Sequence, residues 1–317
     1  MSKITTVTGP ISPDELGITQ MHEHILLDVY PTRWGYSSVL DDIDVSIEEV
    51  REYKSAGGRT LVEQTMRGGG RDPEGLKRIS EESGINIVMA TAFAWAQFKN
   101  PVATQVNSTS AAELGEILVC DIEEGVDETG IKAGFIGEVG AGGSRMSEGI
   151  NYISPLEERL FRAAARAHRQ TGAMIYTHTY QGELAMEEVA LLEEEHVDLE
   201  KVVIGHLGDR NQADYYEQIA RTGVCLGIDH IGQTHGMQVY APDSRRVDNV
   251  VTLIERGYLA QIVLSQDLFL KEMWHYNNGI GYDHILRSFV PMLSEAGVTD
   301  DQINTMMVEN PARLLAF

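Results

Sequence analysis

Cysteine is scarce in this sequence, and long apolar segments are missing. Of its 317 residues two are cysteines, Cys120 and Cys225. Each lies within an apolar run, which predicts buried packing side chains, a reducing compartment and no disulfide framework. No apolar run reaches the roughly 18 residues that a membrane-spanning helix needs, and residues 1–6 lack the apolar core of a signal peptide. We therefore expect a soluble cytoplasmic protein.

Basic residues are also few. The chain has 25 lysines and arginines against 48 aspartates and glutamates, which gives a formal net charge of −23. The resulting field repels phosphate groups and disfavours binding to nucleic acid or to an anionic membrane. It does not exclude an anionic substrate, because a bound divalent metal ion reverses the sign of the field around it. The expected partner is a small-molecule substrate.

Strand and helix patterns alternate along the chain. Short apolar runs, each followed by a turn and a longer amphipathic segment, are typical of strands and helices around a parallel sheet. Two helices have clear start signals, because Ser110 and Ser154 each precede a glutamate at the third position, Glu113 and Glu157, as in a capping box. Gly172 is expected to end the second of these helices. Eight strands are predicted, at residues 18–22, 60–65, 85–92, 134–139, 173–179, 202–206, 224–229 and 261–267.

No feature of the sequence divides these eight units into separate domains. There is no Pro/Gly/Ser-rich linker, low-complexity tract or change of composition, and 43% hydrophobic residues can form a large core. The pattern favours closure of all eight strands into one (β/α)8 TIM barrel, a single α/β domain over residues 1–317. A homodimer would be ordinary for such a barrel.

Metal-type ligands follow five of the predicted strands. His22 and His24 are two residues apart at the end of the first strand, so both imidazoles point the same way and can bind one ion. Taken alone, this pair is more typical of hydrogen-bonded structural histidines. Similar side chains end four further strands, and in a barrel the strand ends converge on one face. The additional candidate ligands are Glu138, His178, His206 and Asp267.

Six such ligands suit two divalent ions about 3.5–4 Å apart, with Glu138 as the bridge between them. Imidazole and carboxylate ligands without thiolate suit zinc, manganese, cobalt or iron, of which zinc is the expected ion. Asp267 could both bind an ion and accept the proton of the attacking water. Asp209 and the pair Asp229 and His230 could then pass this proton to solvent. Alternatively, Asp209 and Asp229 could each cap a loop or form a salt bridge.

With these residues the sequence resembles a known family, the phosphotriesterase-like members of the amidohydrolase superfamily, and within it the phosphotriesterase homology proteins. The resemblance spans essentially the whole chain. The motifs that carry it are Gln20-Met21-His22-Glu23-His24, Lys132-Ala133-Gly134-Phe135-Ile136-Gly137-Glu138-Val139-Gly140, Thr177-His178-Thr179, Ile204-Gly205-His206, Leu264-Ser265-Gln266-Asp267 and Glu309-Asn310-Pro311-Ala312-Arg313.

This resemblance implies a role for each ligand. His22, His24 and Asp267 would bind the more buried ion and His178 and His206 the more exposed one. Glu138 would bridge the two ions, where true phosphotriesterases and related lactonases use a carboxylated lysine. Residues 134–140 contain no lysine, so the departure concerns the substrate class and leaves hydrolysis in place. Asp209, Asp229 and His230 also resemble the proton relay of the organophosphate-hydrolysing branch.

Substrate contacts are expected in the loops after the strands. Residues 93–107 and 268–282 carry Trp95, Phe98, Trp274 and His275, which could line an apolar pocket or pack the loops themselves. Asp229 is a third expected substrate contact besides Trp95 and Trp274. Arg67 and Arg71, which follow the second strand, could hold a carboxylate or phosphate of the substrate.

The leading hypothesis is hydrolysis of a carboxylic ester or lactone by metal-bound hydroxide, with weak promiscuous phosphotriesterase activity. Cleavage of an N-acyl amide, which some glutamate-bridged relatives perform, is the alternative. A barrel that binds a metal or ligand without turnover belongs to another class, but a pure binding site would not need the proton acceptor Asp267. A metal-dependent aldolase or isomerase shares the fold but typically has fewer histidines.

Overall fold

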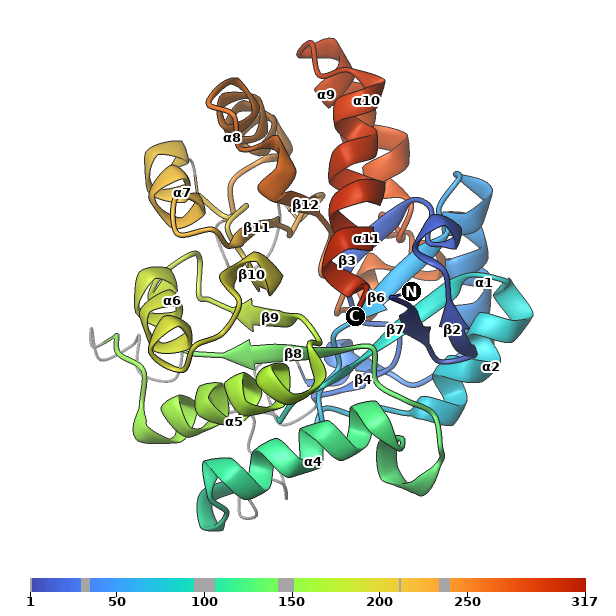
Figure 1. Ribbon diagram of the computed structural model, residues 1–317. Helices are drawn as coiled ribbons and strands as arrows, with labels where there is room; N and C mark the ends of the chain where they lie inside the picture. Colours follow the sequence, from blue (N-terminus) through green and yellow to red (C-terminus); the bar gives the residue numbers. More distant parts are fainter. Residues whose placement is uncertain (1, 30–34, 94–105, 142–150, 211, 234–239) are drawn as a thin grey trace.

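The computed structural model describes residues 2–29, 35–93, 106–141, 151–210, 212–233 and 240–317. Eight parallel strands form a nearly closed barrel, in which each strand pairs with the next one along the chain (Figure 1). This arrangement confirms the predicted TIM barrel. The strands are β3 (Thr19–Glu23), β6 (Thr60–Glu63), β7 (Asn86–Thr91), β8 (Phe135–Gly140), β9 (Ile175–His178), β10 (Val202–Ile204), β11 (Cys225–Ile228) and β12 (Ile262–Leu264).

Helices surround the barrel strands (Figure 1). They are α1 (Ile43–Ser55), α2 (Pro73–Ser83), α4 (Ala111–Glu123), α5 (Pro155–Thr171), α6 (Ala185–Glu194), α7 (Ala213–Ala220), α8 (Asp243–Glu255), α9 (Val290–Glu295), α10 (Asp300–Asn304) and α11 (Asn310–Leu315). The capping boxes predicted at Ser110 and Ser154 are present. Gly172 ends α5 in the left-handed conformation, at a φ of 76°. No helix of the described part is long and apolar enough to cross a membrane.

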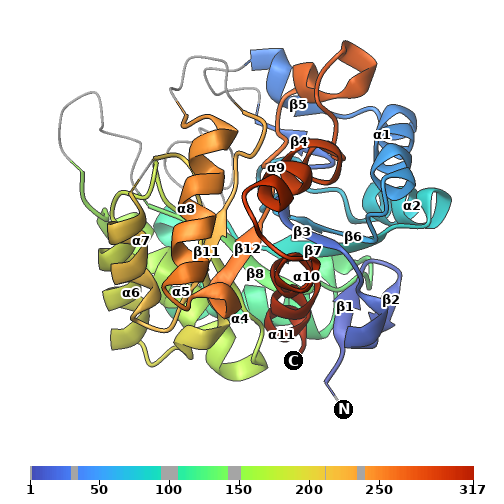
Figure 2. The ribbon, with the colours of Figure 1, turned by 90° about the horizontal axis from the view of Figure 1, so that it is seen from above.

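Two short antiparallel pairs were not predicted, because strands of two or three residues carry no periodic signal. One joins β1 (Ile4–Thr6) to β2 (Gly9–Ile11), and the other joins β4 (Leu27–Asp28) to β5 (Val39–Leu40). Figure 2 shows that the two chain ends lie at the same end of the barrel. There Lys3 and Phe317 exchange two backbone hydrogen bonds of 3.2 Å. The N-terminal hairpin and α11 therefore lie side by side at this end of the barrel.

One prediction about the cysteines is wrong. Cys225 is buried as expected, but Cys120 is exposed. It lies in α4, whose buried positions include Leu118, Val119 and Ile122. An apolar run within a helix still has one side that faces away from the core, and Cys120 lies on that side.

The barrel closes between its first and last strands through the buried carboxyl group of Glu23, whose pKa burial raises to about 8. Glu23 at the end of β3 has no exposed surface. One of its oxygens accepts hydrogen bonds of 2.8 Å from the Ser265 hydroxyl and from the Gln266 N–H, and the other accepts one of 2.9 Å from the Leu268 N–H. The N–H of Asp267 between them donates to a β3 carbonyl at 2.9 Å. These bonds fix the segment after β12 against the end of β3.

Tyr176 of β9 is buried inside the barrel, and glycines on β8, just after β10 and on β11 leave room for it. Tyr176 is fully buried. A Cβ added to Gly137, Gly205 or Gly227 would lie 3.0, 2.9 or 2.4 Å from an atom of the tyrosine side chain. Side chains at these positions would therefore displace the ring. The Tyr176 hydroxyl donates to a carboxylate oxygen of Asp229 at 3.3 Å. The ring therefore lies directly below the residues that follow the strand ends.

Replacement of Glu23 by alanine is expected to destabilise the barrel by about 3 kcal/mol or more. It leaves the buried N–H groups of Gln266 and Leu268 without an acceptor, and each such group costs about 1–3 kcal/mol. Urea unfolding in the presence of a chelator measures the free energy of unfolding. Glu48→Ala, at an exposed position of α1, is the control and should cost little. Equal stabilities of the two variants would contradict the role given to Glu23.

The close approach of Gly227 to Tyr176 predicts a second change in stability. Gly227→Ala places a Cβ against the Tyr176 hydroxyl and is expected to cost about 1–3 kcal/mol, the usual cost of overpacking a core. Adding Tyr176→Phe removes the clashing oxygen, so the double variant should cost less than the sum of the two single changes. Gly115→Ala in α4, where the nearest atoms would lie 3.3 Å away, is the control. Strict additivity in thermal unfolding would refute the contact.

Candidate metal centre

The first group of ligands lies where β3 meets the segment after β12. His22 is fully buried and His24 is 5% exposed. The Nε2 atoms of the two rings lie 3.4 and 3.3 Å from the same carboxylate oxygen, Oδ1 of Asp267. Nε2 of His22 also lies 3.7 Å from Oε2 of Glu138 at the end of β8. The structure therefore places both predicted histidines beside the carboxylate of Asp267, and His22 also beside that of Glu138.

The second group forms around the same glutamate. Nδ1 of His178 at the end of β9 contacts Oε2 of Glu138. Nε2 of His206, after β10, lies 3.4 Å from this oxygen and 2.8 Å from Nδ1 of His178. His178 is the most accessible of the three, with a side chain that is 20% exposed, whereas those of Glu138 and His206 are 5% and 2% exposed. All six predicted ligands therefore converge.

Glu138 is common to both groups. The ligand atoms of His22, His24 and Glu138 lie within 4.8 Å of one another, and so do those of Glu138, His178 and His206. A carboxylate with two oxygens between two sets of imidazoles is a suitable bridge between two ions. The donor atoms are nitrogen and oxygen without thiolate, a set that divalent transition metals accept.

Two buried donor atoms support occupation by a cation. Nε2 of His22 and Oδ1 of Asp267 have no hydrogen-bond partner among the described residues. A buried polar atom without a partner costs about 1–3 kcal/mol, and a cation between these atoms would satisfy both. The residues at this position therefore fit a metal ion.

The surrounding charges keep the two carboxylates in the form that binds cations. Burial alone would raise the pKa of Glu138, but the charge and hydrogen bond of His178 hold it below its ordinary value. Burial would likewise raise the pKa of Asp267, yet His22 and a hydrogen bond from His230 hold it well below its usual range. Both groups are therefore deprotonated at neutral pH.

Further contacts orient the ligand rings. Nδ1 of His24 forms a hydrogen bond of 2.8 Å with the Thr65 hydroxyl. Nδ1 of His206 lies 3.0 Å from one oxygen of Asp229, and the backbone N–H of His206 donates to the other oxygen at 3.0 Å. Burial lowers the pKa of His206, but Asp229 reverses the effect and raises it well above the usual value. Such partners determine which imidazole nitrogen would face a bound metal ion.

Sequence reasoning did not find two of these supporting residues. Thr65 ends the second predicted strand, and Tyr176 lies two residues before His178, on the same face of β9. The positions of both residues in their strands could therefore have indicated that their side chains lie near the ligands. Their partners, however, come from other strands, so only the folded barrel shows the contacts.

Two of the three residues expected in a proton relay, His230 and Asp209, lie in line behind Asp267, whereas Asp229 binds His206. Nε2 of His230 lies 2.8 Å from Oδ2 of Asp267, and Nδ1 lies 2.7 Å from Oδ1 of Asp209. The His230 ring is stacked between those of His206 and Tyr240, at centroid distances of 4.4 and 4.2 Å. Burial lowers the pKa of His230, but the charge of Asp209 more than compensates and raises it to about 9. Asp209 therefore stabilises the protonated form of this ring.

Three residues of the cluster have an unusual backbone. The φ angles of His206, His230 and Asp267 are 60°, 55° and 49°. The left-handed region is uncommon for residues other than glycine, and such strain concentrates at functional sites. It also explains why β10 and β12 end before His206 and Asp267, although the predicted strands extended to these residues.

The expected substrate contacts fare differently. Asp229 is fully buried behind His206, which fits support of a ligand better than contact with a substrate. Trp274 is 2% exposed and belongs to the hydrophobic core. His275 pairs with Asp283 at 2.6 Å. Trp95 and Phe98 lie outside the described residues.

The expected anion site at Arg67 and Arg71 is not supported. Both guanidinium groups already pair with Asp121 and Asp127, at 3.0–3.5 Å. The Arg71 side chain is only 1% exposed. These arginines therefore join the second barrel loop to α4 and to the turn after it.

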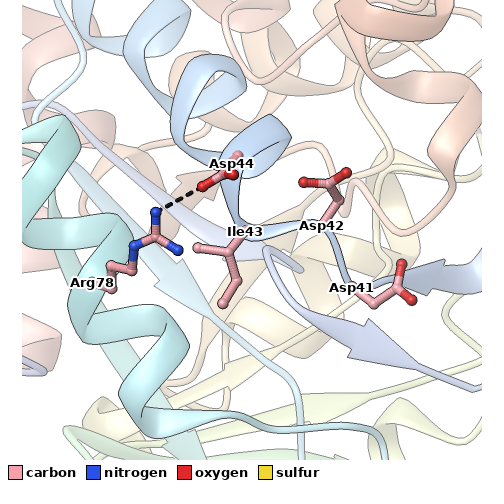
Figure 3. A pocket seen from close by; sticks show the side chains of 5 residues that line it. All are labelled: Asp41, Asp42, Ile43, Asp44 and Arg78. Atoms are coloured by element: carbon pink, nitrogen blue, oxygen red, sulfur yellow. Dashed lines mark hydrogen bonds and ion pairs between the residues drawn. The ribbon is translucent and has the colours of Figure 1, made fainter.

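A surface pocket at the start of α1 is separate from this cluster. Figure 3 shows that it is lined by three aspartates together with Ile43 and Arg78. Asp42 caps α1, Asp44 pairs with Arg78 at 2.7 Å, and Asp41 pairs with Lys271 at 3.0 Å. Each acid thus has a structural partner.

Comparison with known proteins agrees with this geometry. The sequence matches the phosphotriesterase family over residues 2–315. It is 34% identical over 304 residues to the phosphotriesterase homology protein of Escherichia coli, covering 96% of this chain and 99% of that protein. It is 30% identical to an N-acetyltaurine hydrolase of Dictyostelium discoideum, covering 100% and 98% of the two chains. The solved structure of a lactonase from Listeria monocytogenes superimposes with a TM-score of 0.90 at 32% identity, covering 100% and 99%. The chain therefore belongs to the phosphotriesterase family.

Proposed function

We propose that this protein is a binuclear metal-dependent hydrolase that cleaves carboxylic esters or lactones. The observation that carries the proposal is the position of Glu138, which is shared by two groups of histidine ligands. We further propose zinc as the ion in both positions, with manganese, cobalt or iron as alternatives. Bound at this position, two ions would activate a water molecule at neutral pH and polarise the carbonyl oxygen of the substrate.

The residues of the chain supply the path of the proton. Oδ1 of Asp267 faces the ligand rings of His22 and His24, whereas Oδ2 faces Nε2 of His230. A proton released by the attacking water can therefore be taken up by Asp267 and passed to His230. Because Nδ1 of His230 faces the carboxylate of Asp209, its proton stays on that side and Nε2 receives the transferred one.

The relatives support two substrate classes. The lactonase from Listeria monocytogenes matches along the whole chain and favours an ester or lactone. The N-acetyltaurine hydrolase of Dictyostelium discoideum favours the alternative, an N-acyl amide. Weak phosphotriesterase activity is a secondary proposal that rests on the family. The contacts between Asp267, His230 and Asp209 argue against a barrel that only binds a metal or ligand, since binding alone requires no proton acceptor.

We expect about two metal ions per chain and hydrolysis that chelation abolishes. Elemental analysis counts the ions, and a panel of aryl esters, lactones, N-acyl amino acids and aryl phosphotriesters ranks the substrate classes. Hydrolysis should return when zinc is restored. A protein that hydrolyses every substrate equally well after complete removal of the metal would disprove the proposal.

Loss of the proton acceptor should slow turnover strongly. Asp267→Asn is expected to lower kcat/KM by about 10²–10⁴, the usual range for removal of a general base. Asp248→Asn on α8, where the side chain is 57% exposed, is the matched control and should behave like the parent protein. The metal content of both variants is measured in parallel, because Asp267 is also a proposed ligand. Full activity in Asp267→Asn would remove this residue from the mechanism.

A further inference from the structure

The relay ends at a residue that has little access to solvent. Asp209 is 3% exposed. Its Oδ1 faces Nδ1 of His230 at 2.7 Å, and its Oδ2 has no hydrogen-bond partner among the described residues. A carboxylate buried in this way requires a positive charge nearby. The expectation that Asp209 passes the proton to solvent does not fit this position.

Besides the imidazole of His230, a permanent positive charge comes from Arg246 on α8. This arginine is fully buried, and its Nη2 lies 4.0 Å from Oδ1 of Asp209. Its Nη1 donates to Oδ1 of Asp243 at 2.9 Å. Asp243 also accepts the N–H of Gly232 at 2.9 Å and pairs with Nε2 of His284 at 3.0 Å. The guanidinium group therefore lies between two carboxylates, one of the relay and one at the start of α8.

The backbone beside Arg246 is adapted to this contact. A Cβ on Gly208 would lie 3.3 Å from Nε of Arg246 and 2.4 Å from the carbonyl oxygen of Asp229. Glycine at position 208 thus lets the segment that carries Asp209 approach the guanidinium group. Nε and Nη2 of Arg246 have no hydrogen-bond partner among the described residues, so the electrostatic attraction to Asp209 is the main interaction of that side of the group.

We propose that Arg246 is a positioning residue of the reaction, an inference that rests on the proposed hydrolase function. Arg246 holds Asp209 by its permanent charge, and Asp209 in turn fixes His230 for transfer from Asp267. A proton moved onto Asp209 would break the ion pair with Arg246. Asp209 therefore orients the imidazole of His230 and stabilises its charged form, as the carboxylate of a hydrolytic triad does.

Two substitutions of Arg246 test the proposal on zinc-loaded protein. Arg246→Met should lower kcat by about ten- to hundredfold, the usual loss for an outer contact of a metal site, with KM changed little because Arg246 does not reach the substrate. Arg246→Lys should restore part of kcat. Arg245→Met, at the neighbouring and 57% exposed position of α8, is the control. Parent-like kcat in a folded Arg246→Met variant would overturn the proposal.

A second measurement does not depend on activity. The Nδ1 proton of His230 should give a far-downfield proton NMR signal in histidine-labelled protein, identified by its absence in His230→Gln. The signal should persist in Arg245→Met and disappear or shift in Arg246→Met. An unchanged signal in Arg246→Met would overturn the inference. If the parent protein hydrolyses no substrate of the panel, the proposed function fails while this signal still decides the role of Arg246.

Failure of Arg246→Met to fold would also be informative. The same change is then made in an Asp209→Asn background, where Asp209 no longer carries a charge that needs compensation. Recovered folding in the double variant identifies Arg246 as the countercharge of Asp209 and supports the proposal. Failure in both backgrounds shows that the arginine is needed independently of Asp209, and overturns it.

Discussion

The hydrogen bonds of the buried carboxyl group of Glu23 connect the first barrel strand to the segment that follows the last one. Glu23 lies between His22 and His24, and the N–H groups that it binds flank Asp267. Because side chains alternate along a strand, a glutamate directed into this seam leaves both histidines on the opposite face. The interaction that closes the barrel therefore also places three of the six candidate ligands.

Burial of so many ionisable groups is costly, and the structure offsets the cost with successive partners. Glu138 and Asp267 face imidazoles, and behind one of these imidazoles the buried Asp229 binds both the ring and the backbone of His206. Tyr176 then donates its hydroxyl to Asp229 from the centre of the barrel. Each set of partners restricts the side chains that it contacts, and together they orient the ligand ring of His206. Such preorganisation is what a catalytic centre requires.

The sequence predicts the framework of this site better than its support. Strand ends and alternation were enough to find the eight strands and to bring six ligands to one face, because both depend on local pattern. The partners of Thr65, Tyr176 and Arg246 come from other elements, and no local pattern specifies them. Local reasoning also failed where geometry decides: Cys120 lies on the outer side of an apolar helix, and Arg67 and Arg71 are neutralised by Asp121 and Asp127.

The position of Arg246 bears on which substrates suit this protein. A proton that stopped at His230 would lie one hydrogen bond from Asp267 and could return along the same path. Alkoxide and amine leaving groups need such a proton because they are strongly basic, whereas aryl leaving groups depart without one. A relay that ended in solvent would lose the proton, and this loss would not slow the hydrolysis of aryl phosphotriesters, whose leaving groups need no proton. For the proposed hydrolase, a proton held at His230 by the Asp209 and Arg246 pair would be available to lactones, alkyl esters and N-acyl amides, whose leaving groups are strongly basic.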